Sequence, residues 1–128
     1  MGRKRKIPIE SKTYKYLYFI DVDLKGKDTL KFGISNNVMR RMTEYNDSET
    51  VGKLKKIFKI YRCDYPKRVE TFIKWKIRKW TKPVFSQEYF PIEFYETSRK
   101  IAIEFTSDLG YKMKETSIDE IKKKKHIE

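Results

Sequence analysis

Hydrophobic residues gather in short blocks along the chain, and their spacing predicts the order of strands and helices. The block from Tyr14 to Val22 is dense in Tyr, Leu, Phe and Ile, which favours a β-strand. Residues 25–28 read Lys-Gly-Lys-Asp and predict a turn, after which Thr29 to Ser35 predicts a second strand. We therefore expect the domain to open with an antiparallel hairpin.

Three later segments repeat apolar residues at intervals of three and four positions, which is the spacing of an amphipathic helix. These segments are residues 37–46, 66–82 and 94–109. Their end residues support them. Asn36 or Asn37 can cap the first helix with its side-chain oxygen. Pro66 suits the first turn of the second helix, where no N–H is needed, and Gly110 is a natural stop for the third.

The remaining apolar segments complete the predicted fold. Residues 54–63 alternate loosely and predict a third strand, and residues 86–92 predict a short extended piece. The resulting order predicts an α+β domain, with a small central antiparallel three-stranded sheet flanked by helices. We assign this domain to residues 14–110, with a basic N-terminal arm at 1–13 and a basic C-terminal tail at 111–128 that is disordered or weakly helical.

The charge of the chain points to a polyanionic partner. Its 128 residues include 31 Lys and Arg against 18 Asp and Glu, a net charge of +13. Nucleic acid is the partner this favours, with an anionic membrane surface as the competing interpretation. No apolar run is long enough to span a bilayer and the first residues lack the apolar part of a secretory signal, so we expect a cytoplasmic or nuclear protein. A single Cys63 and a single His126 argue against a disulfide framework and a zinc site.

A glycine lies near the end of the second predicted strand, just before the first helix. Gly33 indicates either tight packing or the close approach of another group to the backbone, such as a phosphate. In the helix that follows, Arg40 faces away from the apolar side and can pair with Glu44 in solvent. Arg41 instead flanks the buried side near Tyr45 and lacks that explanation, so it is a candidate phosphate ligand.

Glu70 lies at the margin of the apolar stripe of the second helix. Its ordinary role would be to complement the helix dipole and pair with Lys74. A lone carboxylate in a basic neighbourhood also suits a divalent metal ion held against a phosphate. The surrounding cations are either a solvated face or a nucleic-acid surface, and an exposed tryptophan among them favours the second. We assign nucleic-acid binding to Gly33, Lys67, Arg68, Lys74, Trp75, Arg78 and Lys79.

Taken together, these residues resemble the GIY-YIG nuclease superfamily over residues 15–105. That family opens with a Gly-Ile-Tyr strand and continues with a Tyr-Ile-Gly strand. Tyr16-Leu17-Tyr18 looks like the first motif, and Lys31-Phe32-Gly33 looks like the second. The order and spacing of the motifs carry the resemblance, because each motif alone is loose.

The helices extend the resemblance. Arg41 and Tyr45 match, in their spacing from the second motif, the arginine and tyrosine of the amino-terminal incision domain of bacterial excision-repair nuclease. Glu70 matches the metal-binding glutamate of the family. Residues 88–90, Glu-Tyr-Phe, resemble the Glu-Trp-Phe element of a branch found in phages, large DNA viruses and some cellular proteins.

The resemblance implies a metal-dependent DNA endonuclease. It would place Mg²⁺ or Mn²⁺ on Glu70, where the metal would polarise the phosphate. Arg41 would neutralise the charge that develops on the phosphate. Tyr18, with Lys31 and Tyr45, would orient the attacking water.

The chain departs from the family at two motif positions. Tyr16 replaces the glycine of the first motif, and Lys31 replaces the tyrosine of the second motif. Lys31 would act as a base only with a strongly depressed pKa, and could equally contact phosphate. The first alternative is therefore an inactive or weak nucleic-acid-binding module with the same fold. A membrane-surface or RNA-binding protein is the remaining alternative.

Overall fold

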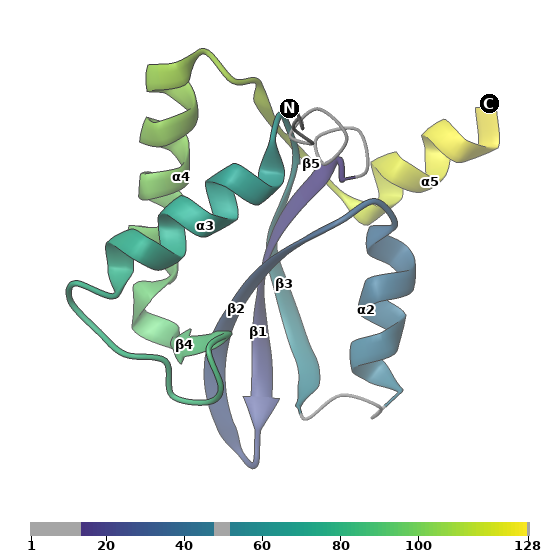
Figure 1. Ribbon diagram of the computed structural model, residues 1–128. Coiled ribbons are helices and arrows are strands. Elements are labelled where there is room, and N and C mark those ends of the chain that lie inside the picture. Colours follow the sequence, from purple (N-terminus) through teal and green to yellow (C-terminus); the bar gives the residue numbers. More distant parts are fainter. Residues whose placement is uncertain (1–13, 48–51, 128) are drawn as a thin grey trace, which may run out of the picture.

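The computed structural model describes residues 14–47 and 52–127. A five-stranded sheet forms its centre, in the order β4-β2-β1-β3-β5, and every neighbouring pair is antiparallel (Figure 1). The strands are β1 (Tyr16–Leu24), β2 (Lys27–Ser35), β3 (Lys53–Cys63), β4 (Tyr89–Pro91) and β5 (Met113–Thr116). The helices are α2 (Val38–Asn46), α3 (Pro66–Ile77), α4 (Tyr95–Leu109) and α5 (Ile118–Ile127), with a short 3₁₀ helix η1 (Ile92–Phe94) before α4.

The α+β class is confirmed, but the prediction of a three-stranded sheet is wrong. The two additional strands are short and come from late in the chain: β4 pairs with the outer edge of β2, and β5 pairs with the outer edge of β3. An unpaired strand edge exposes backbone N–H and C=O groups, and each short strand satisfies part of such an edge. Strand β4 lies within the extended piece predicted at residues 86–92, whereas β5 is only four residues long and carries no clear pattern of its own.

The segment predicted as a basic tail contributes to this fold. Residues 111–127 include β5 and α5, and Ile121 of α5 is buried in the core. The predicted N-terminal arm at 1–13 lies outside the described residues.

The β1–β2 hairpin sets the register of the sheet. Lys25 and Gly26, between the two strands, have φ angles of 54° and 85°, and a type I′ turn needs positive φ at both positions. Leu24 then pairs with Lys27, and further along the ladder Tyr18 pairs with Gly33. A two-residue turn fixes every later pair in the hairpin, so the turn places Tyr18 opposite Gly33.

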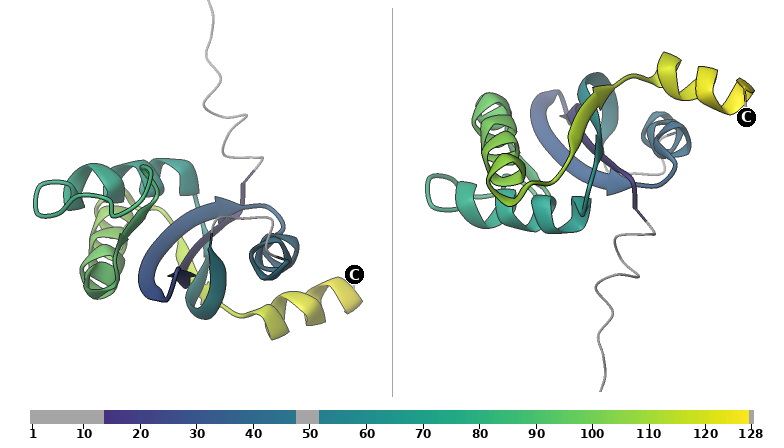
Figure 2. Two further views of the ribbon diagram at one scale, coloured as in Figure 1. Left: turned by 90° about the horizontal axis from the view of Figure 1, so that it is seen from below. Right: turned by 90° about the horizontal axis from the view of Figure 1, so that it is seen from above.

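Helices cover both faces of the sheet (Figure 2). Side chains alternate between the faces of a strand. Leu17 and Phe19 of β1 therefore point toward α3 and α4, while Tyr18 and Ile20 pack with α2 and α5. Burial on both faces explains why the first apolar block is nearly continuous.

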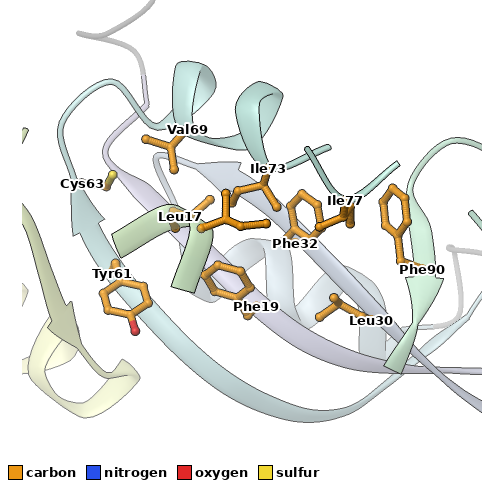
Figure 3. Close-up of a cluster of buried hydrophobic side chains, with 12 residues drawn as sticks. Leu17, Phe19, Leu30, Phe32, Tyr61, Cys63, Val69, Ile73, Ile77 and Phe90 are labelled. Carbon is orange, nitrogen blue, oxygen red and sulfur yellow. The ribbon is translucent and has the colours of Figure 1, made fainter. Parts of the chain in front are cut away.

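The core beneath α3 is the larger of the two packed clusters. Val69, Ile73 and Ile77 of α3 have no exposed surface and lie over Leu17 and Phe32 of the sheet (Figure 3). This confirms the apolar stripe predicted for the second helix at these positions, but not at Trp80, which the same spacing includes and which is exposed beyond the end of α3.

Three helix ends form as predicted and one does not. Helix α3 begins at Pro66, as its sequence signal predicts. The Asn37 side chain accepts a hydrogen bond from the backbone N–H of Arg40, and Gly110 ends α4 with a φ of 73°. The predicted extension of α3 to residue 82 is wrong, because the helix ends at Ile77 in a turn closed by a hydrogen bond from Trp80 N–H to the Ile77 carbonyl. No helix in the described part of the chain is both long and apolar enough to cross a bilayer.

Candidate functional site

Gly33 provides the space in which the Tyr18 ring lies. A Cβ atom built on Gly33 would be 2.6 Å from the Tyr18 hydroxyl oxygen and 2.9 Å from the ring carbon that bears it. Such distances are far inside van der Waals contact. The ring itself is enclosed, with Tyr18 only 1% exposed. The group that approaches the Gly33 backbone is therefore the tyrosine of the neighbouring strand, and the packing role of this glycine is met within the chain.

Helix α2 brings Arg41 and Tyr45 to the same tyrosine. Tyr45 is buried and packs in the same cluster as Tyr18, close enough for the two side chains to interact. Burial raises the pKa of Tyr45 above its usual value, and Tyr18 raises this pKa further. Tyr45 is therefore a neutral hydroxyl that can donate or accept a hydrogen bond at physiological pH.

Arg41 lies beside both tyrosines. Burial lowers the pKa of its guanidinium, but Tyr18 and Glu44 more than offset this, so the group stays positively charged. Its side chain is 45% exposed, so Arg41 connects the buried tyrosines with the surface.

The two neighbouring arginines differ less than the sequence predicts. Arg40 pairs with Glu44 at 3.8 Å, as expected for a solvent-facing pair. The expectation that Arg41 lacks such a partner is wrong, because its Nη1 lies 3.0 Å from the same Glu44 carboxylate. Contact with Tyr18 is what distinguishes Arg41 from its neighbour.

A chain of alternating charges runs from β2 to α3. Lys31 Nζ lies 2.8 Å from Glu88, and Glu88 also contacts Lys74 Nζ at 3.1 Å. Lys74 reaches Glu70 at 3.5 Å, and Glu70 is 3.4 Å from Lys67 on its other side. These ion pairs connect the strand that carries Gly33 with the helix that carries Glu70.

Glu70 is more enclosed than its place at the margin of the apolar stripe suggests. Its side chain is 7% exposed, and Lys67 and Lys74 flank it from one helical turn on each side. A buried carboxylate needs such partners, because desolvation of an isolated charge is costly. The predicted pair with Lys74 is confirmed.

Glu88 joins the two halves of the site. The residue lies just before β4, and the pairing of Tyr89 with Lys31 places it next to β2. Partial burial alone would raise the pKa of the Glu88 carboxyl, but Lys31 and Lys74 together lower it to about 2. Glu88 is thus a fixed negative charge at neutral pH.

Tyr89, like Glu88, was not among the site residues predicted from the sequence. It is buried, pairs with Lys31 across the two strands, and has its ring centre 5.9 Å from Lys31 Nζ. Burial raises the pKa of its hydroxyl. The Glu-Tyr-Phe element contained a usable signal: in a strand, Phe90 faces the core on one side, so Tyr89 must face the other.

The carboxylates around Glu70 could bind only a metal ion that receives most of its ligands from water and substrate. Within residues 14–47 and 52–127 no group of three or more His, Cys, Asp or Glu side chains could hold a metal. Glu70 and Glu88 are brought together, because both contact Lys74 Nζ. Mg²⁺ is often held by one or two carboxylates plus phosphate and water, and these two side chains fit that pattern. The Asp64 carboxylate, in the loop before α3, instead accepts a hydrogen bond from the backbone N–H of Lys112.

The basic residues predicted to contact nucleic acid divide into two groups. Lys74 is occupied by Glu70 and Glu88, and Arg78 binds the Gln87 side chain at 2.9 Å. Trp75 is 55% exposed, as expected, and Lys79 Nζ lies 4.1 Å from its ring centre. Lys67 and Arg68, about two turns before Trp75, belong to the same outer surface of α3.

Comparison with protein-family models matches residues 15–110 to the T5orf172 domain. The match includes the tyrosine cluster, which is Tyr18, Tyr45 and the adjoining Arg41. It also includes the charge chain, which is Lys31, Glu88, Lys74, Glu70 and Lys67. The match stops before β5 and α5. The same comparison against curated proteins finds no match, and neither does the comparison against solved structures.

Proposed function

Because the chain belongs to the T5orf172 domain family, a phage-associated family, we propose from its site that it is a metal-dependent DNA endonuclease of the GIY-YIG type. The observation that carries the proposal is the convergence of Tyr18, Arg41 and Tyr45 beside Gly33. These residues come from two strands and a helix, and they match the family pattern in order and spacing. Lys31 and Glu70 occupy the other two positions of that pattern. A series of ion pairs through Glu88 and Lys74 connects them.

Arg41 has the geometry of a phosphate ligand. It is half-exposed and held in place by Tyr18 on one side and Glu44 on the other. A guanidinium held in this way can donate two parallel hydrogen bonds to a phosphate and offset charge that develops there. Binding of the phosphate would require Arg41 to exchange its contact with Glu44, which is a solvent-exposed pair of low cost.

Glu70 and Glu88 are the residues that would hold a divalent metal ion. Bound Mg²⁺ or Mn²⁺ would supply a Lewis acid for the phosphate and stabilise the leaving oxygen. Lys74 lies between the two carboxylates, so it must move aside, or Glu70 must bind with the single carboxylate oxygen that faces Lys67.

The proton chemistry falls to the tyrosine cluster. Tyr45 is neutral and packs beside Tyr18, so the two hydroxyls can orient a water molecule beside the phosphate. Lys31 contacts the ionised Glu88, and this partner suits an ammonium group. Of its two possible roles, we therefore favour a phosphate contact over a general base.

The test is cleavage of supercoiled plasmid with Mg²⁺ or Mn²⁺ by wild type, Glu70→Gln and Glu96→Gln. Glu96 is the matched control, because it also pairs with a cation on its own helix, Arg99, at 3.0 Å. Glu70→Gln should lose cleavage and keep DNA binding, whereas Glu96→Gln should retain both. Wild-type cleavage rates in Glu70→Gln would refute the metal site.

A second candidate function is a nucleic-acid-binding module without catalysis. The observation that favours it is the neutralisation of Glu70 by Lys67 and Lys74, which leaves little net negative charge to attract a metal ion. Wild-type protein that binds DNA or RNA with a steep salt dependence, yet cleaves neither with any divalent metal, would support this alternative.

A further inference from the structure

Helices α3 and α4 pack on the same side of the sheet (Figure 1). Residues of α3, residues at the end of α4 and Tyr111 line an open groove of about 660 Å³. Four of the residues that line it are aromatic and two are cationic, and no carboxylate side chain is among its lining residues. The aromatic residues are Phe72, Trp75, Phe105 and Tyr111, and the cations are Lys67 and Arg68. None of this surface is needed by the tyrosine cluster on the opposite face of the sheet.

The aromatic side chains form a continuous wall. The rings of Phe72 and Phe105 stack across the two helices, with centres 4.3 Å apart and planes 16° from parallel. Trp75 extends this wall along α3 at 5.7 Å, and Tyr111 extends it beyond α4 at 6.1 Å. Trp75 nevertheless leaves more than half of its surface exposed. Phe72, Phe105 and Tyr111 are partly buried against the core, so Trp75 is the ring of this groove that is most open to a flat partner.

Cations are fixed at the edges of this wall. Arg68 donates a hydrogen bond to the Tyr111 hydroxyl at 3.0 Å and lies 4.6 Å from the Tyr65 ring centre, so its position is held by two aromatic side chains. Lys79 Nζ lies over the Trp75 ring, 4.1 Å from its centre. An apolar peptide would match the wall but not the cations. A strand of unpaired nucleotides matches both, since its bases stack on aromatic rings and its phosphates meet the cations.

We propose that this groove binds the unpaired bases of a single nucleic-acid strand. Bases in a duplex are already stacked on their neighbours and cannot lie on the wall, so the groove selects for single strands. Lys67 lines the groove and also contacts Glu70, and Thr71, another lining residue, directly follows Glu70. A nucleic-acid strand bound in the groove would therefore pass next to Glu70. The groove's relation to a scissile phosphate rests on the proposed function, whereas binding in the groove does not.

The experiment uses the two tryptophans of the chain, Trp75 and Trp80, which are 55% and 57% exposed. Trp80→Phe leaves Trp75 as the single tryptophan, and Trp75→Phe leaves Trp80, which does not line the groove. Each full-length variant is titrated with a dodecamer of deoxythymidylate and with a twelve-base-pair duplex. The single strand should quench tryptophan emission in Trp80→Phe and leave it nearly unchanged in Trp75→Phe.

Affinity is measured separately by anisotropy of the labelled oligonucleotides. Trp75→Ala should weaken single-strand binding about tenfold, within the range for loss of one stacked base, and leave duplex binding within about twofold. Leu109→Glu adds a negative charge to the groove from α4, and Ile103→Glu is its control, because Ile103 is an exposed α4 residue outside the groove. Only Leu109→Glu should weaken single-strand binding.

Equal quenching of both tryptophans, no quenching of Trp75, or preference for the duplex would overturn the proposal. Trp75 emission that changes with protein concentration alone would assign the groove to a second copy of the chain instead. Single-strand binding without cleavage would preserve this inference and remove the proposed function. Cleavage without Trp75 quenching would do the reverse.

Discussion

Replacement of Gly33 by alanine tests whether the Tyr18 ring organises the site. The new Cβ would lie 2.6 Å from the Tyr18 hydroxyl oxygen and 2.9 Å from Cζ, about 1 Å inside ordinary contact distances. The ring cannot swing into solvent, because Tyr18 is 1% exposed and packed against α2. Overpacking of this kind costs about 1–3 kcal/mol. We therefore expect Gly33→Ala to lower the free energy of unfolding by that amount.

A double-mutant cycle with Tyr18→Phe isolates the cause of this loss. Removal of the hydroxyl eliminates the shortest contact with the new methyl group but leaves the one to Cζ, so relief should be partial. In urea unfolding, the double variant should lose about 1 kcal/mol less than the sum of the two single variants. Additive losses, or a Gly33→Ala variant as stable as wild type, would show that Tyr18 does not occupy the space above Gly33.

Three further predictions concern the charged residues of the site. Arg41→Ala should lower the single-turnover cleavage rate at least about 100-fold and Arg40→Ala less than about twofold, since only Arg41 contacts Tyr18; equal losses in two folded variants would contradict this. Lys31→Met should keep the cleavage rate at saturating DNA and weaken DNA binding, whereas loss of that saturating rate would assign Lys31 the role of base. The pKa of Glu88 is lowered to about 2, so its ion pairs stabilise the fold above the ordinary pKa of 4.5, and this contribution should be lost as the pH falls from 4.5 to 2. Acid titration of thermal stability should show a smaller decline for Glu88→Gln, and an unchanged decline would mean that other carboxylates dominate.

Local sequence determined the elements whose signals are contained within a few residues. The apolar spacing of α3 positions Val69, Ile73 and Ile77 on one face, and these residues form the core as predicted. Asn37 caps the start of α2 and Gly110 ends α4, both as predicted, because capping is a contact between near neighbours in the chain. The hairpin was also predicted, from a turn at residues 25–28. The structure limits this turn to Lys25 and Gly26, and the resulting register places Tyr18 opposite Gly33.

Tertiary structure decided what depends on partners far along the chain. Strand β5 is four residues long and largely polar, so it has no pattern of its own and exists because the edge of β3 offers backbone partners. The link from Glu70 to Lys31 passes through Lys74 and Glu88, and Glu88 reaches Lys31 because β4 pairs with β2.

The same dependence explains the two site properties that the sequence did not predict. Helical spacing placed Glu70 at a margin, but the packing of α3 on the sheet decided that its carboxylate is buried between two lysines. Spacing likewise put Arg41 near Tyr45, and the packing of α2 against β1 added Tyr18. Sequence thus determined which residues share a face, because periodicity is local, and the fold determined which faces meet, because that depends on burial of the whole chain.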